Sequence, residues 1–210
     1  MPSYPLAKRI LDTCIAALLL LLLAPVFALV IAAMGVDMLC SSRDRGGWLY
    51  RERRVSGGRE FELLKFRTLR RDVLERLRSD ESHARLHEGD AANLTWAGRK
   101  LLKPWYLDEL PQIWNVLRGD MSLVGPRPWP PSMVANQVAK GLTYRNEFVA
   151  GWTGPAQVEK GVVESSGYAQ LDVAYVGRYR SARGWRVLWT DVVILWRTLV
   201  VIAKGEGLRF

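Results

Sequence analysis

The chain has 210 residues, 49% of them hydrophobic and 24% charged, a composition that suits one compact domain and excludes intrinsic disorder. Its two cysteines, Cys14 and Cys40, exclude a disulfide scaffold and give no sign of an oxidising compartment. The net charge of +9 calls for an anionic partner, such as nucleic acid, lipid headgroups or a phosphorylated substrate. Nine tryptophans favour a membrane interface. Composition therefore predicts a basic domain at a membrane face.

The first predicted element is an uncharged apolar run over 14–36, long enough to cross a hydrocarbon core of about 30 Å. A signal peptide is disfavoured, because the run is long and no small-x-small cleavage pattern follows it. A spanning helix and a re-entrant helical hairpin both remain open. Pro25 favours the hairpin because it interrupts the helical hydrogen bonds, and so do the basic residues at both ends. Those basic residues are Lys8, Arg9, Arg43 and Arg45. Asp12, at the start of the run, is then expected near the interface.

The region after the anchor predicts a β-hairpin over 48–69, turning at Ser56-Gly57-Gly58. A surplus of basic residues over 43–76 predicts a solvated face that can lie against anionic lipid while binding substrate. A polar helix is expected over 70–92. It carries His83 and His87 at a spacing that can chelate zinc, but no further ligand accompanies them, so a solvated helix face is the interpretation.

The C-terminal half predicts a helix, a loop-rich segment, a segment that could be strand or helix, and a final apolar helix. These elements cover 132–149, 151–167, 171–179 and 184–204, in that order. Asp191 and Arg197 lie in the middle of the last helix and argue against a membrane span. A buried or interfacial amphipathic helix is therefore expected there.

The segment 107–117 (LDELPQIWNVL) is the strongest candidate for chemistry. Pro111 suits the first position of a helix, which places Asp108 and Glu109 at or just before its positive N-terminal end. The two carboxylates could simply cap the helix. Alternatively, one could attack phosphorus while the other holds Mg²⁺ against a diphosphate. The spacing alone leaves both interpretations open.

Neighbouring cations favour the second interpretation. Arg127 stands in a turn at 125–128 (GPRP) that two prolines stiffen, and a guanidinium can grip phosphate through two hydrogen bonds. Lys65, Arg67 and Thr68 supply two more cations and a hydroxyl at the end of a predicted strand. Together these residues predict a basin that binds phosphate.

With these residues in view, the chain resembles, nearly end to end, the bacterial sugar transferases of the monotopic phosphoglycosyl transferase family. The resemblance includes Lys8, Arg9 and Asp12 before the proline-broken apolar run. The motifs that complete it are 65–68 (KFRT), 107–112 (LDELPQ), 114–117 (WNVL), 119–128 (GDMSLVGPRP), 153–154 (TG) with 156–158 (AQV), and 171–173 (LDV) with Tyr175. The block 107–128 is the most specific part of the resemblance.

The resemblance implies transfer of a phospho-sugar from a UDP-sugar to polyprenyl (undecaprenyl) phosphate, with UMP released. Such a reaction initiates the assembly of exopolysaccharide, lipopolysaccharide or another glycoconjugate. It implies that Asp108 is the nucleophile in a two-step scheme and that Glu109 is its partner at Mg²⁺. Substrate-binding roles are implied for Lys65, Arg67, Thr68, Gln112, Arg127, Arg145, Gln157, Asp172 and Tyr175, the last four being as suited to bracing the site as to touching substrate.

The implied fold is α+β, with a re-entrant membrane hairpin over 1–42 and a catalytic domain over 43–210. That domain is expected to hold a small sheet or β-hairpin and several interfacial helices, on the cytoplasmic face of the bacterial inner membrane. The lack of a long multi-span region before the hairpin indicates the minimal catalytic form. The variable segments 79–96 and 159–170 are expected to contact the sugar ring and determine which sugar is bound.

The sequence departs from the family pattern in three places. Tyr106 stands where Ser is common, Leu69 where Met is common, and 150–157 (AGWTGPAQ) where the family carries Pro-Gly-Ile-Thr-Gly-Trp-Ala-Gln. These departures bear on which sugar is transferred more than on the type of reaction, because the residues immediately around the nucleophile match the family.

Two other classes of protein compete with an enzyme. A tethered nucleic-acid binder lacks its usual motifs, so no nucleic-acid partner is expected. A membrane scaffold leaves Asp108 and Glu109 without a role.

Overall fold

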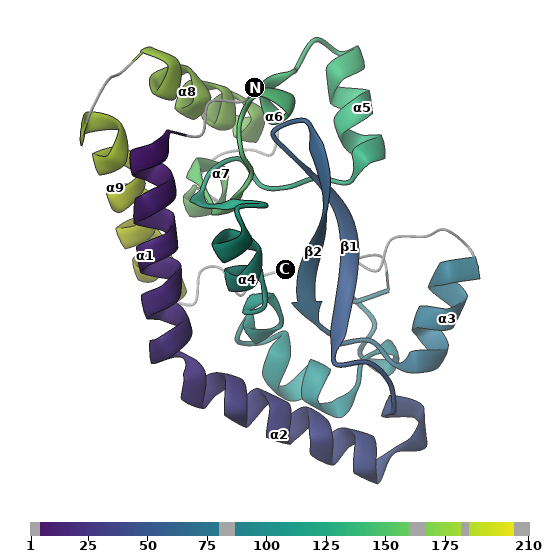
Figure 1. The fold of residues 1–210 in the computed structure, drawn as a ribbon. Coiled ribbons are helices and arrows are strands. Elements are labelled where there is room, and N and C mark those ends of the chain that lie inside the picture. Colours follow the sequence, from purple (N-terminus) through teal and green to yellow (C-terminus); the bar gives the residue numbers. More distant parts are fainter. Residues whose placement is uncertain (1–4, 80–86, 160–166, 182–184, 204–210) are drawn as a thin grey trace. The chain divides into compact units, whose positions relative to one another are not determined.

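The structure is a computed structural model that describes residues 5–79, 87–159, 167–181 and 185–203. It combines many helices with two small two-stranded sheets, as expected for an α+β chain (Figure 1). The chain forms two compact units, each built from separate stretches of sequence. The first unit holds Met1–Leu18, Glu52–Leu63 and Ile113–Phe210, and the second holds Leu19–Arg51 and Leu64–Gln112.

The apolar N-terminal run forms two helices, α1 (Leu6–Leu22) and α2 (Ala24–Cys40), with a bend of 58° between them. The bend confirms the break expected near Pro25, which falls in the first turn of α2. Among the described helices, none alone is long and apolar enough to cross a membrane, whereas α1 and α2 together meet those criteria as a broken span or a re-entrant loop. Both helices expose large apolar side chains, including Leu6, Leu21, Leu22, Leu29, Val36 and Leu39.

The predicted β-hairpin is confirmed. Strands β1 (Leu49–Ser56) and β2 (Arg59–Phe66) pair in one sheet, and each strand passes from one unit into the other. Gly57 and Gly58 connect them with φ angles of +55° and +74°. Two successive positive φ angles are the requirement of the tight turn that matches the twist of paired strands, and glycine adopts them without strain.

The second unit has a core on one face of α2. Val30 and Met34 of α2 pack with Phe66 at the end of β2 and with Leu102 and Leu110. Among its described residues, the unit also contains the short helical turns η1 (Ser42–Asp44), η3 (Ala91–Asn93), η4 (Gly98–Leu102) and η5 (Leu107–Glu109). The polar helix predicted over 70–92 is confirmed only in its first part, as α3 (Arg71–Ser79), whose inner side chains form a separate cluster. Residues 87–89 form a turn, so the expectation that His87 lies on a helix face is wrong. His83 and the rest of 80–86 lie outside the described residues.

Helix α4 (Gln112–Arg118) ends where Gly119 takes a φ of +87°, and α1 supplies the cap to this helix end. The Arg9 guanidinium donates to the carbonyl oxygens of Val116 (2.5 Å) and Leu117 (2.6 Å). A cation at the C-terminal end of a helix satisfies carbonyls that have no partner within the helix. Arg9 therefore caps a helix of its own unit.

The first unit continues through β3 (Ser122–Val124) and β4 (Gly151–Thr153), which pair in parallel with Ser122 opposite Gly151. This pairing was not predicted. It brings the backbone at 125 within van der Waals distance of the backbone at 151 and 154. A Cβ at Gly151 would lie 2.0 Å from the Gly125 nitrogen, and one at Gly154 would lie 2.1 Å from the Gly125 oxygen. Only glycine fits these positions.

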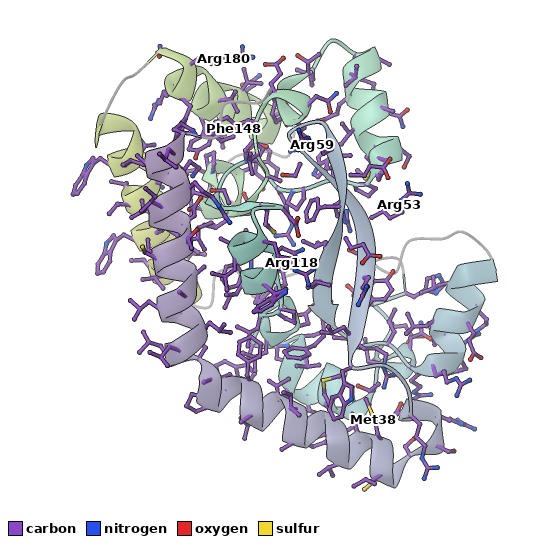
Figure 2. The ribbon with its side chains drawn as sticks, in the orientation of Figure 1. Met38, Arg53, Arg59, Arg118, Phe148 and Arg180 are labelled. Carbon is purple, nitrogen blue, oxygen red and sulfur yellow. The ribbon has the colours of Figure 1, made fainter. Side chains whose placement is uncertain are left out.

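Five further helices follow in the described part of the first unit, and one expectation is corrected. The single helix predicted over 132–149 is wrong, because Gly141, with a φ of +82°, separates α5 (Pro131–Ala139) from α6 (Tyr144–Glu147). A short α7 (Pro155–Val158) precedes α8 (Tyr168–Ser181), which settles 171–179 as helix. The final predicted helix is confirmed as α9 (Trp185–Ala203). Phe148 packs edge-on against Tyr175 and Tyr179 of α8 in the core of this unit (Figure 2).

Candidate active site

Asp108 and Glu109 lie on η5, the short 3-10 turn that precedes α4. The two carboxylates therefore lie just before the helix start, as expected, but on a 3-10 turn of their own. Tyr106, just before the turn, adopts a left-handed conformation with φ +54° and ψ +22°. A bulky residue there costs about 1–2 kcal/mol, and such strain is concentrated at functional sites. The sharp turn at Tyr106 sets the direction of η5.

The Asp108 carboxylate is 3% exposed, and its two oxygens have different surroundings. Oδ2 accepts a hydrogen bond from Lys103 Nζ at 3.0 Å. Oδ1 is buried and has no hydrogen-bond partner. Lys103 is held in turn by Glu88, whose carboxylate lies 2.7 Å from Nζ. One oxygen of Asp108 is thus oriented by a lysine while the other is left for a ligand.

Burial raises the pKa of Asp108 to about 6, although Lys103 acts against this shift. Glu109 raises the pKa of Asp108 further, and Lys65 lowers it. Burial lowers the pKa of Lys103, but the nearby carboxylates of Asp108 and Glu88 raise it overall. Near neutral pH, Asp108 is therefore an ionised carboxylate beside an ammonium group. A desolvated carboxylate of raised pKa is a common property of catalytic acids, bases and nucleophiles.

Replacing Asp108 by Asn is expected to stabilise the fold at pH 7.5 by up to about 3 kcal/mol, because two pKa units correspond to that free energy. The folded-state pKa lies above the ordinary value. The penalty of the ionised carboxylate is complete above pH 6 and becomes small near pH 4, where the folded-state group is protonated and the unfolded-state group is partly protonated. Thermal unfolding in chelator-containing buffer should show a higher midpoint for Asp108→Asn at pH 7.5 and a much smaller increase at pH 4. The exposed Asp72→Asn on α3 is the matched control. An equal difference in unfolding midpoint between Asp108→Asn and the wild type at both pH values would contradict the prediction.

Four other predicted residues lie in the same unit. Lys65 near the end of β2 is half-buried and close enough to lower the pKa of Asp108. Gln112 is 3% exposed, and its Nε2 is a buried donor without a hydrogen-bond partner. Thr68 is buried, and its carbonyl accepts from the Thr95 N–H at 2.8 Å. Glu109 is half-buried beside Asp108. The structure thus associates Lys65 and Glu109 with the nucleophile candidate electrostatically.

Arg67 has a structural environment that the sequence did not predict. Its guanidinium is 4% exposed and donates to three backbone carbonyls: Gly47 (2.8 Å), Leu69 (2.8 Å) and Asp44. All three guanidinium nitrogens are thereby engaged. Arg67 ties the loop after α2 to the end of β2, and this corrects its expected position at a substrate phosphate.

The first unit holds a second buried cluster of predicted residues. Arg145 stacks over the rings of Trp129 and Tyr144, with 4.1 and 4.8 Å from Cζ to the ring centroids. It donates to Asp172 Oδ2 at 3.2 Å and to the Arg127 carbonyl oxygen at 2.8 Å. Burial raises the pKa of Asp172 to about 6 despite Arg145. Arg145 and Asp172 therefore brace the turn that carries the exposed Arg127 side chain.

Tyr175 and Gln157 have different environments in this unit. The Tyr175 hydroxyl is buried, donates to Asp191 Oδ1 at 2.7 Å and lies 3.1 Å from the Val124 carbonyl oxygen. It is a bracing residue of the core. Gln157 on α7 has both amide atoms buried without a hydrogen-bond partner. An unsatisfied buried amide is unfavourable, so Gln157 suits contact with a bound ligand.

Mg²⁺ is compatible with the residues at Asp108. Among the described residues no group of three or more His, Cys, Asp or Glu side chains could enclose a metal ion. Mg²⁺ does not require such a group, since it commonly uses one or two carboxylates together with substrate phosphates and water. Adjacent Asp108 and Glu109, with the buried Asp108 Oδ1 lacking a partner, meet that requirement.

Two residues of the site were missed by sequence reasoning, Lys103 and Glu88. Lys103 stands five residues before Asp108, directly after η4, a π-helical turn, and this proximity to the carboxylate was an available signal. Such turns are often found at functional sites. Gly98 allows η4 to pack closely, because a Cβ there would lie 2.4 Å from the Thr68 oxygen. The role of Glu88 depends on tertiary structure and had no signal.

The chain has a small mixed fold with a buried carboxylate that a lysine orients. These features are typical of an enzyme in which the carboxylate is a candidate nucleophile. The family model for bacterial sugar transferases matches residues 3–205, and the chain belongs to that family. This confirms the family that the motifs predicted.

Several relatives are similar over most of this chain. A UDP-glucose:undecaprenyl-phosphate glucose-1-phosphate transferase of Caulobacter vibrioides is 36% identical over 204 residues, 92% of this chain and 68% of the relative. Exopolysaccharide production protein ExoY of Rhizobium meliloti is 32% identical, covering 98% of this chain and 89% of the relative. A UDP-galactose-lipid carrier transferase of Erwinia amylovora is 33% identical, over 87% of this chain and 39% of the relative. The chain thus spans less than half the length of several curated relatives it matches.

Proposed function

We propose that this chain transfers a sugar 1-phosphate from a UDP-sugar to a polyprenyl phosphate such as undecaprenyl phosphate. The observation that carries the proposal is Asp108, a buried carboxylate with one oxygen oriented by Lys103 and the other without a partner. Relatives named as sugar-phosphate transferases acting on undecaprenyl phosphate support the substrate class. Initiation of exopolysaccharide assembly is consistent with the relative from Rhizobium meliloti.

The reaction has two displacements at one phosphorus. An Asp108 oxygen attacks the phosphorus that bears the sugar, a bond from oxygen to phosphorus forms, and the bond to the bridging oxygen breaks, so that UMP leaves with that oxygen. A phosphate oxygen of the polyprenyl phosphate then attacks the same phosphorus. The acyl-phosphate bond breaks, the lipid diphosphate sugar leaves, and the Asp108 carboxylate is restored. The two large substrates therefore need not be bound together.

The chain's own residues prepare Asp108 for the first displacement. Lys103 fixes the rotamer of the carboxylate and offsets part of its charge, which lowers repulsion against an anionic diphosphate. Glu109 is the proposed ligand of Mg²⁺, which when bound would neutralise phosphate charge. Lys65 is proposed to hold substrate phosphate near Asp108. Contacts of Thr68, Gln112, Arg127 and Gln157 with substrate remain predictions.

The bent pair α1 and α2 supports a membrane anchor for this chemistry. Its length, apolar composition and exposed leucines fit a re-entrant hairpin that lies in one leaflet. We propose the cytoplasmic face of the bacterial inner membrane, where a nucleotide sugar and a lipid phosphate can meet. A boundary between anchor and catalytic part near residue 42 stays a prediction.

The identity of the released nucleotide tests the function. The purified protein in lipid nanodiscs would be incubated with Mg²⁺, undecaprenyl phosphate and each of several UDP-sugars, and the nucleotides separated by chromatography. The proposal expects UMP with at least one donor. Release of UDP in place of UMP would mean transfer of the sugar without its phosphate and would contradict the proposal.

A further inference from the structure

A pocket of about 250 Å³ lies in the second unit where α2 ends. Its polar lining consists of Ser41, Arg43, Asp44, Arg70 and Arg99, with the ring of Trp96 beside them. Asp108 and Lys103 are not part of its lining, so the pocket is separate from the candidate nucleophile. It is also smaller than the pockets of about 300–1,000 Å³ that take drug-sized ligands, which makes a nucleotide sugar a poor fit.

The pocket is strongly basic. It contains three guanidinium groups and one carboxylate, a formal charge of about +2 by the ordinary pKa values of these groups. Across the described residues, no hydrogen bond or ion pair engages the guanidinium of Arg43, Arg70 or Arg99. Several guanidinium groups lining one pocket favour a phosphate ligand, because each guanidinium can donate two parallel hydrogen bonds to the phosphate oxygens.

Asp44 indicates that the ligand also carries a hydrogen-bond donor. Its side chain is 7% exposed, and its Oδ1 is buried with no hydrogen-bond partner. A buried carboxylate oxygen without a donor is unfavourable, so it needs one from a ligand. The position of Asp44 is fixed by its backbone, because its carbonyl accepts from Arg67 and its N–H donates to the Ser41 carbonyl at 3.1 Å.

The frame of the pocket is equally well fixed. The backbone of Leu69 pairs with that of Leu94, and the Arg70 N–H donates to the Asn93 carbonyl at 2.9 Å. These bonds hold the segment with Arg70 beside the segment with Trp96. The Trp96 ring is 54% exposed at the pocket, and tryptophan is enriched at the level of lipid headgroups.

We infer that this pocket binds the headgroup of an anionic glycerophospholipid that carries hydroxyl groups, the chemistry of phosphatidylglycerol. The arginines take the phosphodiester, Asp44 accepts from a headgroup hydroxyl, and Trp96 lies against the glycerol backbone. The inference rests on the proposed membrane placement, in which the end of α2 lies at the headgroups. The net positive charge of the pocket favours an anionic lipid over a zwitterionic one.

The test is lipid retention measured by native mass spectrometry of the full chain in neutral detergent micelles. The micelles are doped with either phosphatidylglycerol or phosphatidylmethanol, which has the same charge but no headgroup hydroxyl. Phosphatidylglycerol is expected to be retained about tenfold more strongly, as a hydrogen bond to a charged group of about 1.4 kcal/mol gives that ratio. Asp44→Ala, which removes the acceptor, is expected to abolish this preference even though it adds positive net charge.

The double variant R70Q/R99Q is expected to lower phosphatidylglycerol retention about tenfold or more. The matched control is R71Q/R76Q, which removes the same charge from exposed α3 arginines paired with Glu75 and Asp72. Equal loss in the control, or equal retention of the two lipids, would overturn the inference. So would displacement of phosphatidylglycerol by inorganic phosphate or by undecaprenyl phosphate. Retention is measured without a sugar donor, so a failure here is separate from failure of the proposed transfer.

Discussion

Asp108→Asn is expected to lower the rate of UMP release by at least a factor of about 10³, since removing the attacking group from a covalent mechanism leaves only residual catalysis. The amide is a poor nucleophile, while its size and shape are close to those of the carboxylate. Lys103 keeps Glu88 at 2.7 Å, so the substitution leaves no buried cation without a partner. The protein should therefore remain folded and, at neutral pH, become more stable than the wild type.

Asp72→Asn is the control for this loss, because Asp72 is an exposed carboxylate of the same unit that pairs with Arg76. It should retain wild-type turnover. Both variants would be compared by steady-state release of UMP, with thermal unfolding measured on the same samples. An Asp108→Asn protein that kept about a tenth or more of wild-type turnover would exclude Asp108 as the nucleophile.

Lys8→Met is expected to destabilise the protein by about 3–5 kcal/mol, the usual cost of removing one partner from a buried ion pair. Lys8 is fully buried, with its Nζ 2.6 Å from Asp191 Oδ2 on α9 and 3.9 Å from Asp12 Oδ2. Tyr175 and Tyr179 also donate to Asp191. Without the ammonium group, the Asp191 carboxylate is left buried with only neutral donors. Thermal unfolding in nanodiscs should show the midpoint lowered by about 10 °C or more.

The double variant K8M/D191N separates the charge effect from lost packing. It should recover at least half of the loss in the unfolding midpoint, because the two tyrosines can still donate to the amide oxygen that replaces the carboxylate. The exposed Lys140→Met at the end of α5 is the matched control and should leave the midpoint unchanged. A Lys8→Met protein that unfolds within about 2 °C of the wild type would show that the pair contributes little, as many exposed pairs do.

Features of the fold that depend on local chemistry were predictable from the sequence. Pro25 breaks the apolar run and Gly57-Gly58 makes the hairpin turn, because each acts through the backbone of its own neighbourhood. Gly141 is a signal of the same kind, but it lies inside the segment 132–149 that is predicted from the sequence as one helix. The structure shows that the positive φ of Gly141 ends α5.

Features that depend on distant residues were not predictable from one sequence. The parallel pairing of Ser122 with Gly151 and the pairing of Lys8 with Asp191 join segments with no common local pattern. In the sequence Lys8 is a basic flank of the apolar run, and Asp12 is expected near the interface. Both are buried: Asp12 accepts from the Ser122 hydroxyl at 2.7 Å, while Lys8 faces Asp191. Charge flanking an apolar run does not distinguish a membrane anchor from a buried network.

The candidate site was predicted in its residues more fully than in its geometry. The motif at 107–112 identified Asp108 and Glu109 and placed them at or just before a helix start, but it gave no sign of the 3-10 turn that carries them. Arg67 is expected at a substrate phosphate, whereas its guanidinium holds backbone carbonyls, and of the two roles open for Tyr175 the structure shows the bracing one. A motif records which residues a fold needs but does not separate those that contact substrate from those that hold the contact residues in place.

The central claim, a phospho-sugar carried on Asp108, is tested most directly by incubating the protein with its UDP-sugar and Mg²⁺ in the absence of polyprenyl phosphate. A covalent intermediate on Asp108 should give a burst of about one UMP per chain and a gain in intact mass equal to one sugar phosphate. Asp108→Asn should show neither, and adding undecaprenyl phosphate to the wild type should remove the added mass. UMP that forms only when both substrates are present, with no change in protein mass, would rule out the covalent intermediate.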